Sequence, residues 1–236
     1  MSDTTDPLTC TIEDGVAVLR LDDGKVNVVS HRLIECFHAG LDRARAEATA
    51  VAVIGRDGKL SAGFDLTEMT AGIERTRALV GAGGRLLMRI FTHPQPVTVA
   101  VTGHALAAGA LLVLSCDTRI GAAGPAKIGL NETAIGMGLP IYALELAQAR
   151  LDPAHLTRAA VQAEIYDPEG AVAAGYLDEV VAADVCATRA IEEARRLGAL
   201  PGSAYAHTKR GLRQAIADRV VAGIDADMEA LTAPRA

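Results

Sequence analysis

The chain has 236 residues, half of them hydrophobic and 22% charged, which is enough apolar material for one globular core with a small appendage. Aromatic residues make up 3% and tryptophan is absent, so we expect a core of aliphatic side chains. The formal net charge is −6 and there is no lysine- or arginine-rich run, which argues against a nucleic-acid partner.

Two features of the sequence bear on where in the cell the protein lies: its cysteines and its longest uncharged segment. The four cysteines are widely spaced and never form a C-x-x-C pair, so we expect reduced thiols in a cytoplasmic protein and no metal site. Residues 1–6 lack the basic start and apolar stretch of a signal peptide. Segment 97–116 is uncharged over about the length that spans a bilayer. Its central Thr-Gly-His favours a buried strand, a turn and a buried helix instead, so no membrane insertion is expected.

The first elements are predicted to be a β-hairpin and a helix. Residues 9–12 and 16–21 alternate in polarity around Asp14-Gly15, a pair that tolerates positive φ in a turn. Ser30 is expected to cap a helix that runs to about residue 48 with one apolar face.

The next segment predicts a strand, a polar loop and the start of a helix. Residues 51–55 form a short continuous apolar run, which is typical of a strand covered on both faces. Residues 56–59 are predicted to be a loop. Asp65 and Glu68 have the D-x-x-E spacing of a capping box that opens a helix.

The remaining chain predicts an α/β fold that ends in helices. Strands are expected at 97–101 and 118–121, with a helix from about 107 to 115 between them, and 127–130 completes this part. Beyond Pro140 helical patterns dominate to about residue 231. We therefore predict an α/β core over residues 1–182 and a helical region over residues 183–236.

Two stretches, 60–69 (LSAGFDLTEM) and 103–120 (GHALAAGALLVLSCDTRI), bring small residues to the first turn of a helix. Backbone N–H groups in that turn have no partner within the helix, and small side chains let a ligand approach them. If the N–H groups of Phe64 and Ala108 converge, they form a two-donor site for an oxyanion.

A third stretch, 127–136 (KIGLNETAIG), places the carboxylate of Glu132 just after a short strand. Its neighbours in the sequence are mostly apolar, which predicts a raised pKa and suits a general acid/base.

These three stretches resemble the motifs of the crotonase superfamily, the enoyl-CoA hydratases and isomerases. SAGFDLTEM is similar to its first oxyanion-hole motif, AAGALLVLSCDTRI to its second, and IGLNETAIG to the mitochondrial-type Δ3,Δ2-enoyl-CoA isomerases. The resemblance covers about residues 16–181. It implies a crotonase-like spiral of ββα units with a C-terminal helical region that assembles a homotrimer or a hexamer (a dimer of trimers).

The resemblance also implies a ligand and a set of site residues. The ligand would be an acyl-CoA thioester, with no cofactor beyond the CoA of the substrate. The N–H groups of Phe64 and Ala108 would hold the thioester oxygen, and Glu132 would be the catalytic residue. Family members often have glycine in place of Ala108, so the added methyl narrows the site. The implied substrate-binding residues are Ala62, Gly63, Asp65, Leu66, Leu111 and Asn131.

One departure from the family favours isomerisation. Hydratases of the family have a first catalytic glutamate at the position of Leu111 and a second at that of Glu132. A double-bond shift needs a single base, because one carboxylate can remove a proton from C2 and return it to C4. An isomerase is therefore preferred. A hydratase, a thioester hydrolase and a non-catalytic acyl-CoA-binding protein stay open as alternatives.

Other candidate residues are given plainer roles. Glu145 is a rival carboxylate that is expected to be solvated or ion-paired on a helix. His104 is expected to have a packing or hydrogen-bonding role, and Asp117 and Arg119 to form ion pairs with each other or with neighbours. The glycine-rich segment 81–84 lacks the last glycine of a dinucleotide fingerprint and follows a helical pattern, so it is not interpreted as one. Loop cations that could meet the CoA phosphates are Lys25, Arg56 and Lys59.

Overall fold

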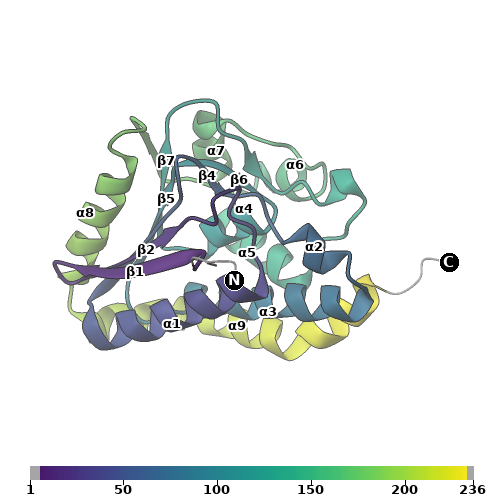
Figure 1. Cartoon of the computed structure of the whole chain (residues 1–236), viewed down its shortest axis with the longest axis horizontal. Helices are drawn as coiled ribbons and strands as arrows, with labels where there is room; N and C mark the ends of the chain where they lie inside the picture. Colours follow the sequence, from purple (N-terminus) through teal and green to yellow (C-terminus); the bar gives the residue numbers. More distant parts are fainter. Residues whose placement is uncertain (1–5, 233–236) are drawn as a thin grey trace, which may run out of the picture.

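The computed structural model describes residues 6–232 and contains two β-sheets surrounded by helices (Figure 1). Residues 1–5, at the start of the predicted α/β core, and residues 233–236, at the end of the predicted helical region, lie outside the described residues. Nearly all of residues 1–6, which lack the pattern of a signal peptide, therefore also lie outside them. The larger sheet has the order β1-β2-β3-β5-β7-β9, and every neighbouring pair is parallel except the β1–β2 hairpin. Its strands are β1 (Leu8–Glu13), β2 (Val16–Leu21), β3 (Ala50–Ile54), β5 (Val97–Val101), β7 (Thr118–Ala122) and β9 (Glu179–Val181).

A smaller parallel sheet follows the order β4-β6-β8. Its strands are β4 (Gly58–Ser61), β6 (Gly103–Leu106) and β8 (Ile128–Gly129). Each comes directly after a strand of the larger sheet in the chain, and a helical segment follows each. The chain therefore repeats a strand–strand–helix unit three times, which brings the loops after β4, β6 and β8 to the same edge of the smaller sheet.

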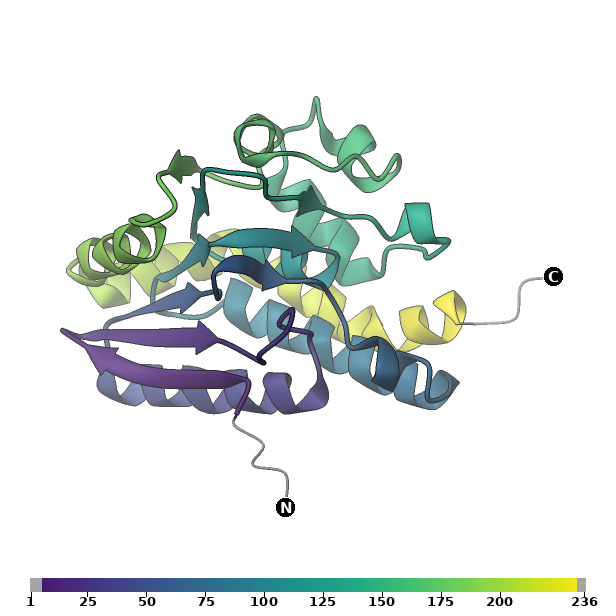
Figure 2. The same cartoon turned by 45° about the horizontal axis from the view of Figure 1, so that its top comes forward.

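The helices form the rest of the molecule. They are α1 (His31–Glu47), α2 (Leu66–Met69), α3 (Ile73–Phe91), α4 (Ala108–Ser115), the short 3₁₀ helix η1 (Thr133–Ile135), α5 (Ile141–Arg150), α6 (Leu156–Ala160), α7 (Pro168–Ala174), α8 (Cys186–Gly198) and α9 (Gly202–Leu231). Helix α8 packs against β3, β5 and β7, while α1, α3 and α4 cover the other side of the larger sheet. Helix α9 runs alongside α3, as Figures 1 and 2 show.

The predicted hairpin and first helix are confirmed. Asp14 and Gly15 have φ values of 48° and 80°, so both turn residues adopt the left-handed conformation. The hydroxyl of Ser30 accepts a hydrogen bond from the N–H of Leu33 at 3.1 Å and caps α1. The predicted strands at 51–55, 97–101 and 118–121 and the helix at 107–115 agree with the structure to within one residue.

Two predicted irregular segments are wrong. Half of the predicted loop 56–59 belongs to β4, and the Thr-Gly-His segment expected to be a turn contributes to β6. These two strands pair so closely that a methyl group on Gly103 would overlap the carbonyl of Gly58. Such short strands follow from pairing between distant segments, which a local polarity pattern does not record.

The capping box at α2 is only half present. The Asp65 carboxylate accepts hydrogen bonds from the N–H groups of Thr67 (2.7 Å) and Glu68 (3.4 Å). The reciprocal bond is absent because the N–H of Asp65 donates to the carbonyl of Val29. The Glu68 carboxylate instead accepts from the N–H of His31 at 3.2 Å and contacts the imidazole of that residue. Glu68 therefore ties α2 to the start of α1.

Residues 97–116, the uncharged segment about as long as a membrane span, form β5, β6 and α4 within the fold. No helix within residues 6–232 is both long and apolar enough to cross a membrane.

The glycine-rich segment 81–84 lies inside α3 and serves close packing. A methyl group on Gly83 would approach the Phe64 ring to 2.5 Å, which is well inside van der Waals contact. A methyl on Gly84 would lie 2.6 Å from Ile224 of α9 and would also overlap the ring of Tyr142. These glycines therefore let α5, α9 and the loop after β4 approach α3.

Candidate active site

The loops after β4 and β6 meet at a close approach between Gly63 and residues 107–108. Gly63 has a φ of 102°, and a methyl group there would lie 3.0 Å from the Ala107 side chain and 3.7 Å from the backbone nitrogen of Ala108. Ala107 itself has a φ of 51°, a conformation that a non-glycine residue adopts only at an energetic cost. The two small-residue turns therefore converge on one another.

Both predicted donor amides lie at this junction. The parallel bridge between Val29 and Phe64 uses the carbonyl of Gly63 and the N–H of Asp65, which leaves the Phe64 amide out of the bridge. Ala108 is the first residue of α4, so its N–H has no acceptor within the helix. The two turns that carry these amides therefore lie next to each other.

Glu132 follows β8 and is nearly buried, with 8% of its surface exposed. Within the described chain its Oε2 atom has no hydrogen-bond partner. Burial raises the pKa of Glu132 to about 7, although hydrogen bonds from the N–H groups of Glu132 and Asn131 partly oppose that rise. The carboxyl group is thus poised to accept or donate a proton near neutral pH.

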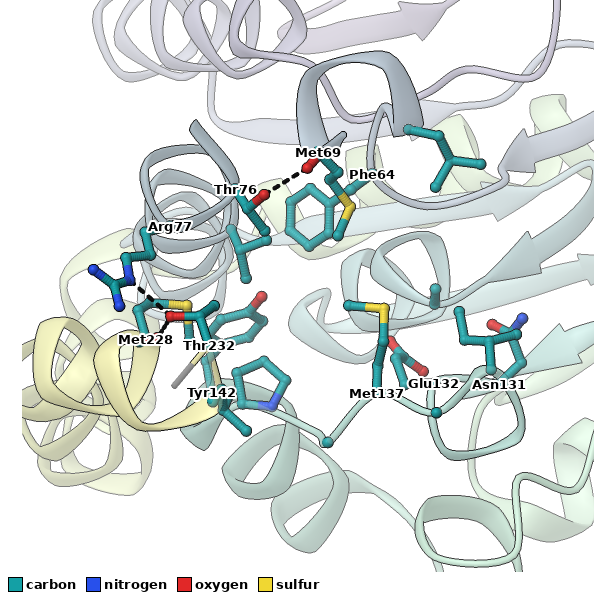
Figure 3. Close-up of a pocket in the computed structure, with 18 of the residues that line it drawn as sticks. Phe64, Met69, Thr76, Arg77, Asn131, Glu132, Met137, Tyr142, Met228 and Thr232 are labelled. Carbon is teal, nitrogen blue, oxygen red and sulfur yellow. Dashed lines mark hydrogen bonds between the residues drawn. The ribbon is translucent and has the colours of Figure 1, made fainter. Parts of the chain in front are cut away.

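A cavity of about 390 Å³ lies in front of Glu132 (Figure 3). Its wall is largely apolar and comes from the loops after β4, β6 and β8 and from α2, α3, α5 and α9. The residues that line it are Ala62, Phe64, Leu66, Met69, Thr76, Arg77, Val80, Ala107, Asn131, Glu132, Ile135, Gly136, Met137, Gly138, Pro140, Tyr142, Met228, Leu231 and Thr232.

Of the residues singled out in the sequence, five line this cavity: Ala62, Phe64, Leu66, Asn131 and Glu132. The remaining four do not line it. Gly63 shapes the turn and Asp65 caps α2. Ala108 is 3% exposed and, with Phe64, borders a very small apolar void, while Leu111 is 1% exposed within α4.

Sequence reasoning missed the part of the wall made by α3, α5 and α9. Tyr142, Arg77, Met228 and Thr232 belong to this part. The glycines at 83 and 84 were the one available signal, because a helix with adjacent interior glycines indicates a close neighbour. Nothing in the sequence indicates that residues 228–232 return to a site built by residues 62–142.

The other candidate side chains have partners elsewhere. Glu145 forms an ion pair with Arg219 at 2.9 Å, as predicted for a helical glutamate. The imidazole of His104 accepts a hydrogen bond from the N–H of Lys127 at 2.9 Å, which agrees with the structural role expected for it.

Asp117 and Arg119 pair with neighbours and not with each other. Asp117 binds Lys209 and Arg213 of α9, each at 2.6 Å, and the Arg119 guanidinium binds Asp178 at 2.6 Å. All the cations in these pairs are well shielded from solvent, so the pairs link α9 and the segment before β9 firmly to β7.

The three loop cations are not equivalent. Lys59 borders a surface depression of about 210 Å³ together with Ala62, His104 and Lys127, next to the main cavity. Arg56 instead pairs with Asp22 at 3.4 Å and donates to the carbonyl of Lys25 at 3.2 Å.

Comparison with known proteins gives a consistent result. The family model described as enoyl-CoA hydratase/isomerase matches residues 11–236. A crystal structure of an enoyl-CoA hydratase/isomerase family protein from Pseudomonas syringae superposes with a TM-score of 0.93 at 42% identity, over 97% of this chain and 99% of that one.

Curated relatives carry both activity names. Enoyl-CoA delta isomerase 1, mitochondrial, from Homo sapiens is 30% identical over 91% of this chain and 73% of its own length. A probable enoyl-CoA hydratase from Bacillus subtilis is 34% identical over 55% of this chain and 52% of its own length.

Proposed function

Because the chain belongs to the enoyl-CoA hydratase/isomerase family, we propose that it is an acyl-CoA isomerase that shifts a double bond from C3 to C2. The observation that carries the proposal is the single carboxylate of Glu132, which is buried, has a pKa of about 7 and faces an apolar cavity. At the position where hydratases of the family have their other glutamate, this chain has the buried Leu111.

The proposed reaction is a proton transfer in two steps. The Glu132 carboxylate removes a proton from C2 of a 3-enoyl thioester, and the electron pair delocalises onto the thioester oxygen and C4. The N–H groups of Phe64 and Ala108 hold that oxygen. The Glu132 carboxylic acid then returns the proton to C4, which leaves the double bond between C2 and C3 and regenerates the carboxylate.

The energetics are consistent with this role. Each positioned donor in an oxyanion hole stabilises the transition state by roughly 3–4 kcal/mol. A base with a pKa near 7 is about half ionised at neutral pH, yet it remains basic enough to deprotonate an activated carbon. Both features require a dry site, which the apolar wall of the cavity supplies.

Further elements of the proposal come from the family resemblance. The residues that would help to shape the substrate site are Ala62, Gly63, Asp65, Leu66, Leu111 and Asn131. Of the three loop cations, Lys59 is the best placed for a CoA phosphate. No cofactor would be needed beyond the CoA of the substrate. A cytoplasmic homotrimer or hexamer is proposed as the working form, and light scattering on the purified protein tests its mass.

Deuterium exchange at C2 of an acyl-CoA in heavy water is the most direct test. We expect the wild type to exchange C2 protons and to isomerise a 3-enoyl-CoA. Glu132→Gln should lower both rates by roughly 10²- to 10⁴-fold while acyl-CoA binding persists, because the base is lost and the cavity is kept. Glu145→Gln is the matched control, since that carboxylate is ion-paired outside the cavity, and it should keep wild-type rates.

The outcomes separate the alternatives. Binding without exchange in the wild type would identify a non-catalytic acyl-CoA-binding protein. Rapid hydration of crotonyl-CoA would favour a hydratase, the name carried by the Bacillus subtilis relative. Full exchange in Glu132→Gln would refute the assigned base.

A further inference from the structure

A carboxylate near the end of α9 caps the start of α5. The N–H of Ile141, the first residue of α5, donates a hydrogen bond of 2.8 Å to Oδ2 of Asp227. The residue at the N-cap position of α5 is Pro140, whose side chain has no polar atom that could serve as a cap. A carboxylate at a helix N-terminus accepts from a donor that the helix leaves unused, and it meets the positive end of the helix dipole. Asp227 therefore supplies the cap from 86 residues away in the sequence.

The segment between Glu132 and α5 forms one wall of the cavity, and Met137 and Pro140 belong to that wall. The carbonyl of Glu132 accepts hydrogen bonds from the N–H groups of Ile135 at 3.1 Å and Met137 at 2.9 Å. These bonds tie the backbone of Glu132 to the segment that ends at α5. The placement of its carboxyl group is therefore set by β8 on one side and by α5 on the other.

A second contact joins α9 to the same segment. A methyl group on Gly138 would lie 2.9 Å from the Leu231 side chain, so the last turn of α9 packs directly against the chain between Glu132 and α5. Burial, followed by the charges of Glu132 and Asp227, raises the pKa of Tyr142 well above its ordinary value, which agrees with both carboxylates lying near that ring. The base and the capped helix thus stand at the two ends of one short segment.

Two carboxylates on the same stretch of α9 differ in their surroundings. Asp227 is half-buried, and it is not among the described residues that line the cavity. The side chain of Asp225 is 81% exposed and pairs with Arg85 of α3 at 2.7 Å. An exposed pair of this kind contributes little to stability. Asp225 therefore offers a comparison for Asp227 on the same helix.

We propose that Asp227 is a positioning residue: by capping α5, its carboxylate holds the segment that sets where the Glu132 carboxyl group lies. A misplacement of about 1 Å in a reacting group can lower a rate by about 10²-fold, so an anchor outside the cavity wall can still govern turnover. This inference rests on the proposed function, because it takes Glu132 as the base. It adds a residue of the last helix to a site built by residues 62–142.

The test compares Asp227→Ala, which removes the cap, with Asp227→Asn, whose amide oxygen can still accept from the Ile141 N–H. Asp225→Ala is the matched control, because it removes a carboxylate two residues earlier on the same helix. Isomerisation of 3-hexenoyl-CoA gives kcat and KM, and C2 exchange of hexanoyl-CoA in heavy water reports deprotonation alone. Backbone amide exchange over residues 133–141 measures the anchoring itself, and urea unfolding checks that each variant is folded.

We expect Asp227→Ala to lower kcat and the C2 exchange rate by about 10- to 100-fold with KM nearly unchanged, because the base is displaced while the cavity remains. Amide exchange over residues 133–141 should become faster in the same variant. Asp227→Asn should recover most of the rate, since asparagine caps a helix about as well as aspartate does. Asp225→Ala should behave like the wild type.

Three results would overturn the inference: unchanged amide exchange in Asp227→Ala, a kcat that falls no further than in Asp225→Ala, or a fall that Asp227→Asn does not recover. If Asp227→Ala does not fold, Asp227→Glu decides, because it keeps the charge and moves the acceptor by one methylene. A kcat below that of Asp227→Asn then supports the inference, and an equal kcat overturns it.

The failure of this inference can be told apart from the failure of the proposed function. A wild type that shows neither C2 exchange nor isomerisation would refute the function. Faster amide exchange over residues 133–141 in Asp227→Ala alone would still establish that this carboxylate anchors the segment after Glu132. Normal catalysis in both the wild type and Asp227→Ala would do the reverse.

Discussion

At the scale of single residues, Glu132 combines two properties that oppose each other. Its carboxyl group lies in an apolar wall with one oxygen lacking any partner in the described chain, which disfavours the charged form. The same desolvation brings its pKa into the range that proton transfer requires. The residue thus weakens the fold at the pH where it is proposed to work.

The first prediction concerns the pH dependence of the reaction. If Glu132 acts as the base, kcat/KM should fall about tenfold per pH unit below pH 7, because the protonated acid cannot accept the C2 proton. Isomerisation rates measured between pH 5.5 and 8.5 check this. A profile that stays flat from pH 5.5 to 7.5 would exclude a base with the raised pKa.

The second prediction concerns stability. The folded pKa of about 7 exceeds the ordinary value of 4.5, so the folded state binds the proton more tightly. The resulting stabilisation is complete below pH 4.5 and is lost as the pH rises to about 7. We therefore expect Glu132→Gln to gain stability relative to the wild type, by roughly 2–3 kcal/mol more at pH 8 than at pH 5.

Urea unfolding at the two pH values measures this difference, and Glu145→Gln serves as the control. A difference that does not change with pH would show that the Glu132 carboxyl is not desolvated in the folded protein.

At the scale of elements, α3 supports the cavity through adjacent glycines. Gly83 makes room for the ring of Phe64, and Gly84 makes room for Tyr142 and Ile224. The apolar wall therefore depends on an element that carries none of the residues proposed to do the chemistry.

The third prediction follows from that packing. Gly84→Ala should destabilise the protein, because overpacking costs about 1–3 kcal/mol and the gain in helix propensity is at most about 1 kcal/mol. Gly211→Ala in α9 is the matched control, since a methyl there meets nothing within 4 Å and should be neutral or stabilising. Urea unfolding of both variants measures the contrast. Equal free energies of unfolding for the two variants would show that a methyl group fits at position 84 without overlapping its neighbours.

The helices and strands also show which parts of the fold can be predicted from the sequence and which cannot. Strands β1, β2, β3, β5 and β7 of the larger sheet and helices α1 and α4 were predictable because their apolar patterns are local. Strand β9 was not predicted, since it is a three-residue strand in a region dominated by helical patterns. Strands β4 and β6 were not, because each is polar or glycine-rich and exists through pairing with the other. The loops with Phe64, Ala108 and Glu132 could be found from their motifs, whereas the contributions of Tyr142 and Met228 depend on how α5 and α9 pack.

At the scale of the whole molecule, the last helix completes a cavity that the first two thirds of the chain begin. Met228 of α9 is 4% exposed and lies on the cavity wall beside Leu231 and Thr232. The shape of the cavity proposed to hold the acyl chain is therefore set partly by residues far in sequence from Glu132.

The fourth prediction tests that division of roles. Met228→Ala should enlarge the cavity and raise kcat/KM for longer or branched acyl chains relative to short ones by a few-fold, with a loss of about 2–5 kcal/mol of stability. Val221→Ala, on an exposed part of α9, is the control and should leave the chain-length profile unchanged. A profile that is identical in both variants would place the chain-length limit elsewhere.

The two ends of α9 are held in place by different contacts. Near its start, Lys209 and Arg213 each form an ion pair with Asp117. These pairs tie its first half to the residue just before β7. Its last turns contact the rest of the protein through the cavity wall, the hydrogen bond from the Ile141 N–H to Asp227 at 2.8 Å and the Arg77–Thr232 hydrogen bond. The last turns of α9 are therefore expected to open locally more often than its first half. Backbone amide exchange should accordingly be faster at residues 226–232 than at 209–220, and an acyl-CoA ligand should slow it selectively at the tip.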